Sequence, residues 1–113
     1  MTVRRCLLEM GWGADLHGGD YTKAAQRAVQ NALQHVSLGF TGPMGKSGSD
    51  LILDVTIGVA EPDKVNKQAI ADAFPYGRQK NIKVVKGGLD VPGDRPTDFC
   101  AVANAAIILS LDV

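Results

Sequence analysis

The stretch from Phe99 to Leu111 constrains the fold more than any other part of this sequence. It reads FCAVANAAIILSL and is apolar almost throughout. An apolar run of this kind is typical of a strand that is buried on both faces. We therefore expect it to be the central strand of a sheet, or a strand at an interface between subunits.

Two helices are expected to pack on that sheet. The clearer one is predicted from Tyr21 to Val36, where apolar residues recur at intervals of three and four after an N-cap aspartate, Asp20. Four alanines on its inner face allow it to lie close to strands. The second helix is predicted from Lys64 to Phe74, because Pro62 precedes it and the sequence Pro-Tyr-Gly follows it.

The remaining strands are expected at Val3–Met10, at Asp50–Val59 and from Ile82 onward, the last interrupted near Gly87-Gly88. The order is then β-α-β-α-β-β, an α+β two-layer sandwich with two helices on one sheet. The chain of 113 residues fits a single α/β domain spanning 1–113. Since the helices cover one sheet face only, the other needs burial. A homo-oligomer is therefore expected, with a trimer favoured.

The charge balance bears on the possible partners. Twelve basic and twelve acidic residues give no net charge, so the composition predicts binding to neither nucleic acid nor an anionic membrane. No apolar run approaches the roughly 20 residues that span a bilayer, and the N-terminus lacks a signal-peptide pattern. We expect a cytoplasmic protein with a small-molecule ligand.

A glycine-rich segment, expected as a loop from Gly11 to Gly19, holds the main candidate site. In an extended segment the side chains of Asp15 and His17 point the same way. They are predicted to act as catalytic acid and base or, together with Asp20, to bind a divalent metal such as zinc or magnesium. The alternatives are a structural, hydrogen-bonded His17 and an Asp20 that only caps the helix.

The same segment could bind an anion. The amides of Gly18 and Gly19, together with Lys23, lie where the helix N-terminus attracts negative charge. Trp12 is expected either in the core or as one wall of a pocket. Glu61, near the end of an expected strand, is a further candidate acid, with a surface carboxylate as the alternative.

A second glycine-rich loop, GFTGPMGKSGS, spans 39–49. It is not a Walker A motif, because Phe40 stands where the first glycine belongs. Lys46 and Ser47 could still cradle an anion or form part of a lid over the first site. A solvated flexible loop is the alternative.

The pattern G-x-G-x-D-x-H-G, carried here by residues 11–18, resembles the mark of a family of small conserved proteins of unknown function. The resemblance extends to LDVTIGV, VVKGGLDVP and ANAA, and so over the whole chain. It implies that the site around Asp15 and His17 matters, and it implies no particular reaction.

Two narrower resemblances concern shorter segments. A stretch of about ten residues around the G-x-G-x-D-x-H pattern is similar to methylerythritol cyclodiphosphate synthase, a trimeric metal enzyme, and this resemblance implies zinc ligation by Asp15 and His17. That enzyme's third ligand is a histidine, and the only other histidine here is His35. The run from Asp20 to Lys23 is similar to the helix start of ring-opening amidohydrolases of cyclic amides.

Two function classes therefore stay open from the sequence. The first is a small oligomeric enzyme that catalyses hydrolysis or cyclisation with Asp15 and His17. The alternative is a non-catalytic module that binds a small anion, or a purely structural oligomer.

Overall fold

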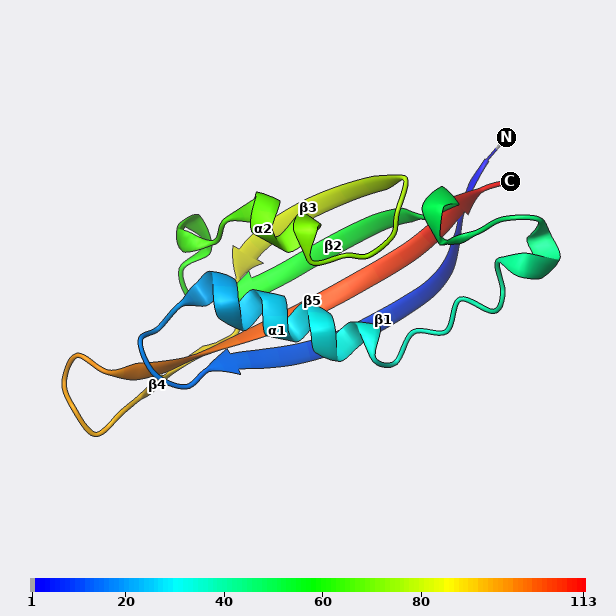
Figure 1. The fold of residues 1–113 in the computed structure, drawn as a ribbon. Helices are drawn as coiled ribbons and strands as arrows, with labels where there is room; N and C mark the ends of the chain where they lie inside the picture. Colours follow the sequence, from blue (N-terminus) through cyan, green and yellow to red (C-terminus); the bar gives the residue numbers. More distant parts are fainter. Residues whose placement is uncertain (1) are drawn as a thin grey trace.

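A computed structural model describes residues 2–113, and Figure 1 shows two helices on one face of a single twisted sheet. The strands are β1 (Val3–Asp15), β2 (Ile52–Val59), β3 (Gln79–Lys86), β4 (Leu89–Pro92) and β5 (Phe99–Asp112); the helices are α1 (Tyr21–Leu33) and α2 (Lys67–Asp72). The sheet order is β1-β5-β2-β3, with β4 also paired to β5. The predicted α+β class is confirmed, with one strand more than expected.

The central position predicted for the Phe99–Leu111 strand is confirmed by β5. It pairs antiparallel with β1 along one side, and with β2 and then β4 along the other. Its residues facing the helices are fully buried or nearly so: Ala101, Ala103, Ala105, Ile107, Leu109 and Leu111. The opposite face of β5 is covered less completely, since Asn104 is exposed there.

The first strand is longer than predicted. The residues from Gly11 to Asp15, which were expected to begin the glycine-rich loop, belong to β1 instead. β1 continues from Met10 to Asp15 because β5 offers each of these residues an antiparallel partner. Gly11 and Gly13 are strand residues that face α1. A Cβ on Gly11 would lie 2.5 Å from the backbone N of Ala32, and one on Gly13 would lie 2.3 Å from the backbone N of Ala28. These glycines therefore let the helix approach the strand.

Helix α1 begins at Tyr21 as predicted and ends at Leu33, three residues before the expected end. Its buried face consists mainly of small residues, namely Ala24, Ala25, Ala28, Val29 and Ala32. They pack against the glycines of β1 and the alanines of β5. Small side chains thus meet small side chains, which brings helix and sheet close together.

Helix α2 is about half as long as predicted. Its N-cap is Asn66, whose side chain accepts a hydrogen bond from the backbone N of Ala69 at 3.2 Å. The preceding residues Pro62–Lys64 form a separate 3-10 turn, which removes them from the helix. Among residues 2–113, no helix is long and apolar enough to cross a membrane.

The predicted interruption of the strand at Gly87-Gly88 is confirmed, since β3 ends at Lys86 and β4 begins at Leu89. Here the chain leaves β3, passes the end of β2 and joins β5 as β4. Gly88 has a φ of +61°, and a Cβ there would lie 2.1 Å from the carbonyl O of Val102. Only glycine fits this crossing without displacement of the backbone.

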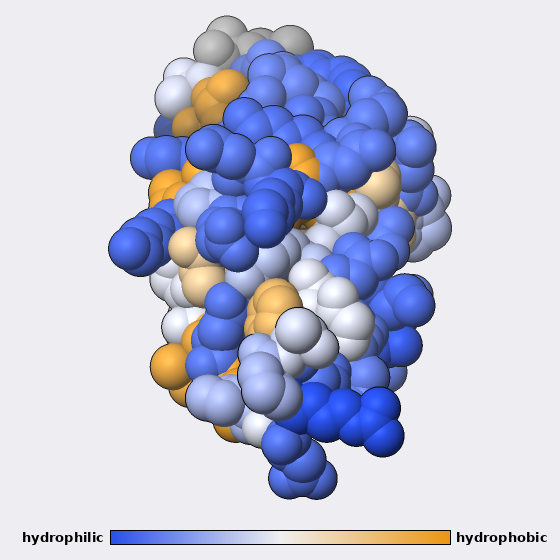
Figure 2. Space-filling view, turned by 90° about the vertical axis from the view of Figure 1, so that its left-hand side faces the viewer, coloured by the Kyte–Doolittle hydropathy of each residue, from blue (hydrophilic) through white to orange (hydrophobic). Residues whose placement is uncertain are grey.

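The second face of the sheet, which we call the open face, carries no helix. Large apolar side chains are exposed on it, namely Leu8, Met10 and Trp12 from β1 and Leu89 and Val91 from β4. Trp12 is 62% exposed, so the expectation that it could fill the core was wrong. Figure 2 looks at the end of the molecule that carries the β4–β5 turn, and hydrophobic atoms gather along one side of it.

Replacement of Gly13 by alanine should destabilise the fold, because the new methyl group would press on the backbone of α1. Overpacking of this kind costs about 1–3 kcal/mol. The free energy of unfolding in urea measures the effect. Gly42→Ala is the matched control, since no atom lies within 4 Å of a Cβ at that position. Equal losses of stability in the two variants would contradict the close approach of α1.

Candidate functional site

The end of β1 is tied to the start of α1 by a buried aspartate. Asp15 is 7% exposed, and its Oδ2 accepts a hydrogen bond from the backbone N of Asp20 at 2.8 Å. Its Oδ1 lies 3.6 Å from a guanidinium nitrogen of Arg27, which also donates to the carbonyl O of Ala14. Asp15 therefore closes the loop of residues 16–19.

Asp20 is the N-cap of α1, as the helix prediction had it. Its Oδ1 accepts a hydrogen bond from the backbone N of Lys23 at 3.0 Å. In the loop before it, Gly18 and Gly19 both have positive φ angles, of 91° and 61°. A Cβ on Gly19 would lie 2.1 Å from the ring of Phe99, so the loop is fitted closely to the start of β5.

His17 pairs with an aspartate that the sequence analysis missed. Its Nδ1 lies 3.0 Å from Oδ2 of Asp98, and the backbone N of Gly18 donates to Oδ1 of the same carboxylate at 3.4 Å. The His17 side chain is 84% exposed, whereas that of Asp98 is 28% exposed. The hydrogen bond with His17 is the main cause that lowers the pKa of Asp98 below its ordinary value.

A hollow of about 530 Å³ adjoins this pair at the tip of the molecule. Besides His17 and Asp98 it is lined by Asp94, Arg95 and Thr97 from the β4–β5 turn. Figure 2 shows strongly hydrophilic atoms at this tip. The site thus offers an imidazole, a guanidinium, a hydroxyl and two carboxylates beside an open space.

A second polar cluster lies near the first turn of α1. The hydroxyl of Tyr21 is hydrogen-bonded to Oδ2 of Asp90 at 2.6 Å and to Oε2 of Glu61 at 3.0 Å. Burial, and then the two carboxylates, raise the pKa of Tyr21 above its ordinary range. The hydrogen bond from Tyr21, and then that from Lys64, lower the pKa of Glu61. This cluster joins α1 to β4 and to the loop after β2.

The structure shows where the predicted anion-binding residues lie. The amide of Gly18 donates to Asp98 and that of Lys23 donates to Asp20, so carboxylates of the chain already occupy the N-terminus of α1. Because like charges repel, a bound anion there would be disfavoured. This geometry gives the anion-binding hypothesis little support.

The loop of residues 39–49, which carries Lys46 and Ser47, follows α1 at the opposite end of the molecule from the segment that joins β1 to α1 (Figure 1). The distance between the two ends can be counted along β5. Ala101 pairs with Asp15, near His17, and Ser110 pairs with Ile52 at the start of β2, near the loop of residues 39–49. Nine residues of strand separate these two points, or about 30 Å. Within one protomer, the loop of residues 39–49 therefore cannot form a lid over His17.

Asp15, His17 and Asp20 are each hydrogen-bonded to other groups of the chain. Oδ2 of Asp15 accepts the Asp20 amide, Oδ1 of Asp20 caps α1, and Nδ1 of His17 faces Asp98. Across residues 2–113, no group of three or more His, Cys, Asp or Glu side chains is arranged to hold a metal ion. Metal binding by these three residues stays a prediction, and we derive no chemical step from it.

The pH dependence of stability should report the ionised form of Asp98. Because folding lowers the pKa of this carboxyl, its stabilising effect is present above the ordinary carboxyl pKa of about 4 and is lost as the pH falls through the lower folded value. The free energy of unfolding of the wild type should therefore fall relative to that of Asp98→Asn as the pH drops from about 5 to about 2. Parallel curves over this range would contradict the His17–Asp98 contact.

Removal of the Tyr21 hydroxyl should lower stability by about 1 kcal/mol, because a hydrogen-bonded phenol that is 3% exposed is lost. Thermal or urea unfolding of Tyr21→Phe measures this. Tyr76→Phe is the control, since the Tyr76 hydroxyl makes no hydrogen bond to any described residue. An unchanged Tyr21→Phe variant would mean that the cluster with Asp90 and Glu61 does not hold α1 in place.

Comparisons with known proteins agree with the fold. The crystal structure of an FtsZ-like protein of unknown function from Nostoc punctiforme is similar to this chain, with a TM-score of 0.88 and 31% sequence identity, over 100% of this chain and 99% of that chain. No curated protein matches the chain. Residues 5–109 match the model of a family described as conserved hypothetical protein, Lin0512. The chain therefore belongs to the Lin0512 family of conserved hypothetical proteins.

Proposed function

We propose that this protein is an acid–base enzyme in which His17 is the catalytic group and Asp98 positions it. The observation that carries the proposal is the 3.0 Å contact between Nδ1 of His17 and Oδ2 of Asp98. A carboxylate at Nδ1 favours the tautomer with hydrogen on that nitrogen, so that Nε2 of the neutral ring can accept a proton. The high exposure of His17 leaves Nε2 accessible to water and to a substrate.

The surroundings of the pair favour a small polar substrate. Arg95 brings a guanidinium to the hollow beside His17, which can bind a carboxylate or phosphate group, and Asp94 brings a carboxylate, which accepts hydrogen bonds from hydroxyl or amino groups. In hydrolysis, Nε2 would take a proton from water and return it to the leaving group. In cyclisation, it would take the proton from a hydroxyl of the substrate as that oxygen closes the ring, and give it to the leaving group that the oxygen displaces.

Asp15 has a different part in this proposal from the one that the sequence suggested. It is buried, and its oxygens contact the backbone of Asp20 and the side chain of Arg27. It would therefore hold the loop that carries His17 rather than transfer a proton. The catalytic pair is then His17 with Asp98, and Asp15 supports it from the end of β1.

Hydrolysis of activated esters tests the proposal without knowledge of the natural substrate. The probes are p-nitrophenyl acetate and a p-nitrophenyl ester with a free carboxylate, and the release of p-nitrophenol is measured. General acid–base catalysis contributes about 10²–10⁴-fold, so His17→Ala should lower kcat/KM by about that factor. Asp98→Asn should lower kcat more than it raises KM.

His35→Ala is the matched control, because His35 is also exposed but lies beyond the end of α1, away from the hollow. Its activity should equal that of the wild type. Equal ester hydrolysis by the His17→Ala and wild-type proteins would refute the proposed role of His17. The same conclusion would follow if the two histidine variants lost activity alike.

A further inference from the structure

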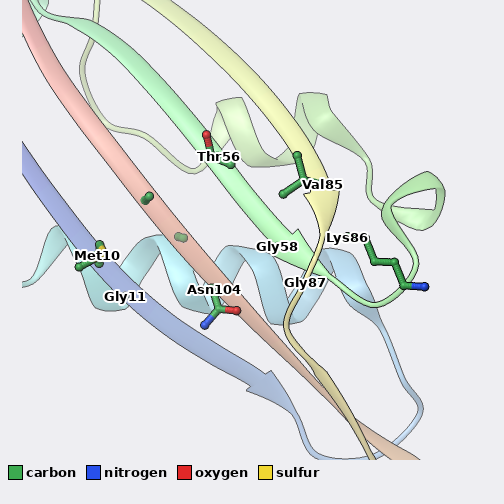
Figure 3. A pocket seen from close by; sticks show the side chains of 10 residues that line it. Met10, Gly11, Thr56, Gly58, Val85, Lys86, Gly87 and Asn104 are labelled. Carbon is green, nitrogen blue, oxygen red and sulfur yellow. The ribbon is translucent and has the colours of Figure 1, made fainter.

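The centre of the open face holds a hollow that no part of the chain fills. It has a volume of about 320 Å³ and lies over β5 and β2, between Met10 on one side and Val85 and Lys86 on the other (Figure 3). Its floor contains Gly58 and Ala106, which have little or no side chain. Three segments that are far apart in the sequence, LDVTIGV, VVKGGLDVP and ANAA, meet at this point.

One row of paired residues crosses the sheet at the hollow. Trp12 of β1 and Gly58 of β2 both pair with Asn104 of β5, from opposite sides. Asn104 is held in place, because its Oδ1 accepts a hydrogen bond from the backbone N of Gly88 at 3.1 Å. On this row, the exposed Trp12 side chain lies on one side of β5, and Gly58, which has no side chain, lies on the other.

We infer that the open face is an interface between two copies of this chain, in which Trp12 of each copy packs over Gly58 of the other. The proposed two-fold axis lies between the two sheets and runs parallel to β5. It places β1 of each copy opposite β2 of the other. Since adjacent strands are about 4.8 Å apart, Trp12 and Gly58 lie at nearly equal distances from that axis. The operation therefore places each indole over the partner's hollow.

The next row agrees with this arrangement. Met10 and Thr56 both pair with Ala106, so the same axis puts the Met10 side chain over the partner's Thr56, which also lines the hollow. One row further along, the axis places Leu8 over the partner's Asp54, since both pair with Ile108. Two packed sheets keep their strands within about 30° of each other, which keeps these central rows in contact. A two-fold interface is also self-complementary, so the same face serves both partners.

The size of the face is sufficient for a stable pair. β5 has 14 residues and so spans about 46 Å, and four strands side by side cover about 19 Å, so the sheet face measures at most about 900 Å². A standard interface buries about 800 Å² on each partner. Monomeric proteins rarely expose apolar patches of more than a few hundred Å², so cover by a second copy also accounts for the exposed side chains of β1 and β4.

Light scattering after size exclusion, at micromolar concentration, tests the inference. The wild type should have twice the 11.9 kDa mass of the chain, and Trp12→Asp should have the mass of one chain. Met44→Asp is the matched control: Met44 is also an exposed apolar residue, at 43%, but lies in the loop after α1. It should remain a dimer. A wild-type monomer or trimer would overturn the two-fold arrangement, as would a dimeric Trp12→Asp variant.

Fluorescence gives a second readout, because Trp12 is the sole tryptophan. Dilution of the wild type should move its emission to longer wavelength as the indole leaves the partner's hollow. Gly58→Ala adds a methyl group that makes only ordinary contacts, the nearest at 3.5 Å, so the fold should be retained. In this variant the shift should occur at a higher protein concentration. An emission maximum that does not change with concentration in either protein would contradict the packing of Trp12 over Gly58.

Discussion

The close approach of α1 to the sheet is the contact on which the rest of the structure depends. It is possible because Gly11 and Gly13 have no side chains where the helix backbone passes, and because both α1 and β5 present alanines to each other. Larger residues would push the helix outward and separate its N-terminus from the end of β1. The small residues therefore set the position of α1 relative to the strands, and with it the loop between them.

That position determines the candidate site. With α1 held against β1, the carboxylate of Asp15 reaches the backbone of Asp20, and the loop of residues 16–19 is drawn across the start of β5. The β4–β5 turn lies beside this loop and brings Asp98 to His17. Each carboxylate near the helix start has a donor within the chain, so the exposed imidazole is the group that is left facing solvent.

The two faces of the sheet differ because of the same distribution of side-chain sizes. In β1, small residues such as Gly11 and Gly13 face the helices. The alternate positions, which face away from the helices, carry large residues such as Met10 and Trp12. Gly88 serves the crossing from β3 to β4, and the absence of a side chain at Gly58, beside this crossing, opens the hollow next to Asn104. The distribution of glycines thus shapes the surface that we assign to the partner copy.

The sequence by itself determined the central strand, the start of α1 with its Asp20 cap, and the break at Gly87-Gly88. Each of these depends on residues that are neighbours along the chain, either through hydrophobic periodicity or through the conformational freedom of glycine. Membership of an uncharacterised family could likewise be anticipated from the sequence. Both helices are shorter than the sequence predicted, since α1 ends at Leu33 and α2 begins only after Asn66, whose side chain accepts from the amide of Ala69.

Only the tertiary structure decided how long β1 is and which residues form the site. A strand continues as far as its partner does, and the length of β5 extended β1 through residues that read as a loop. The pairing of His17 with Asp98 joins residues 81 positions apart. It follows from the antiparallel register that sets the end of β1 beside the start of β5. Contacts of this range are fixed by packing and not by local pattern, so the sequence identified His17 but not its partner.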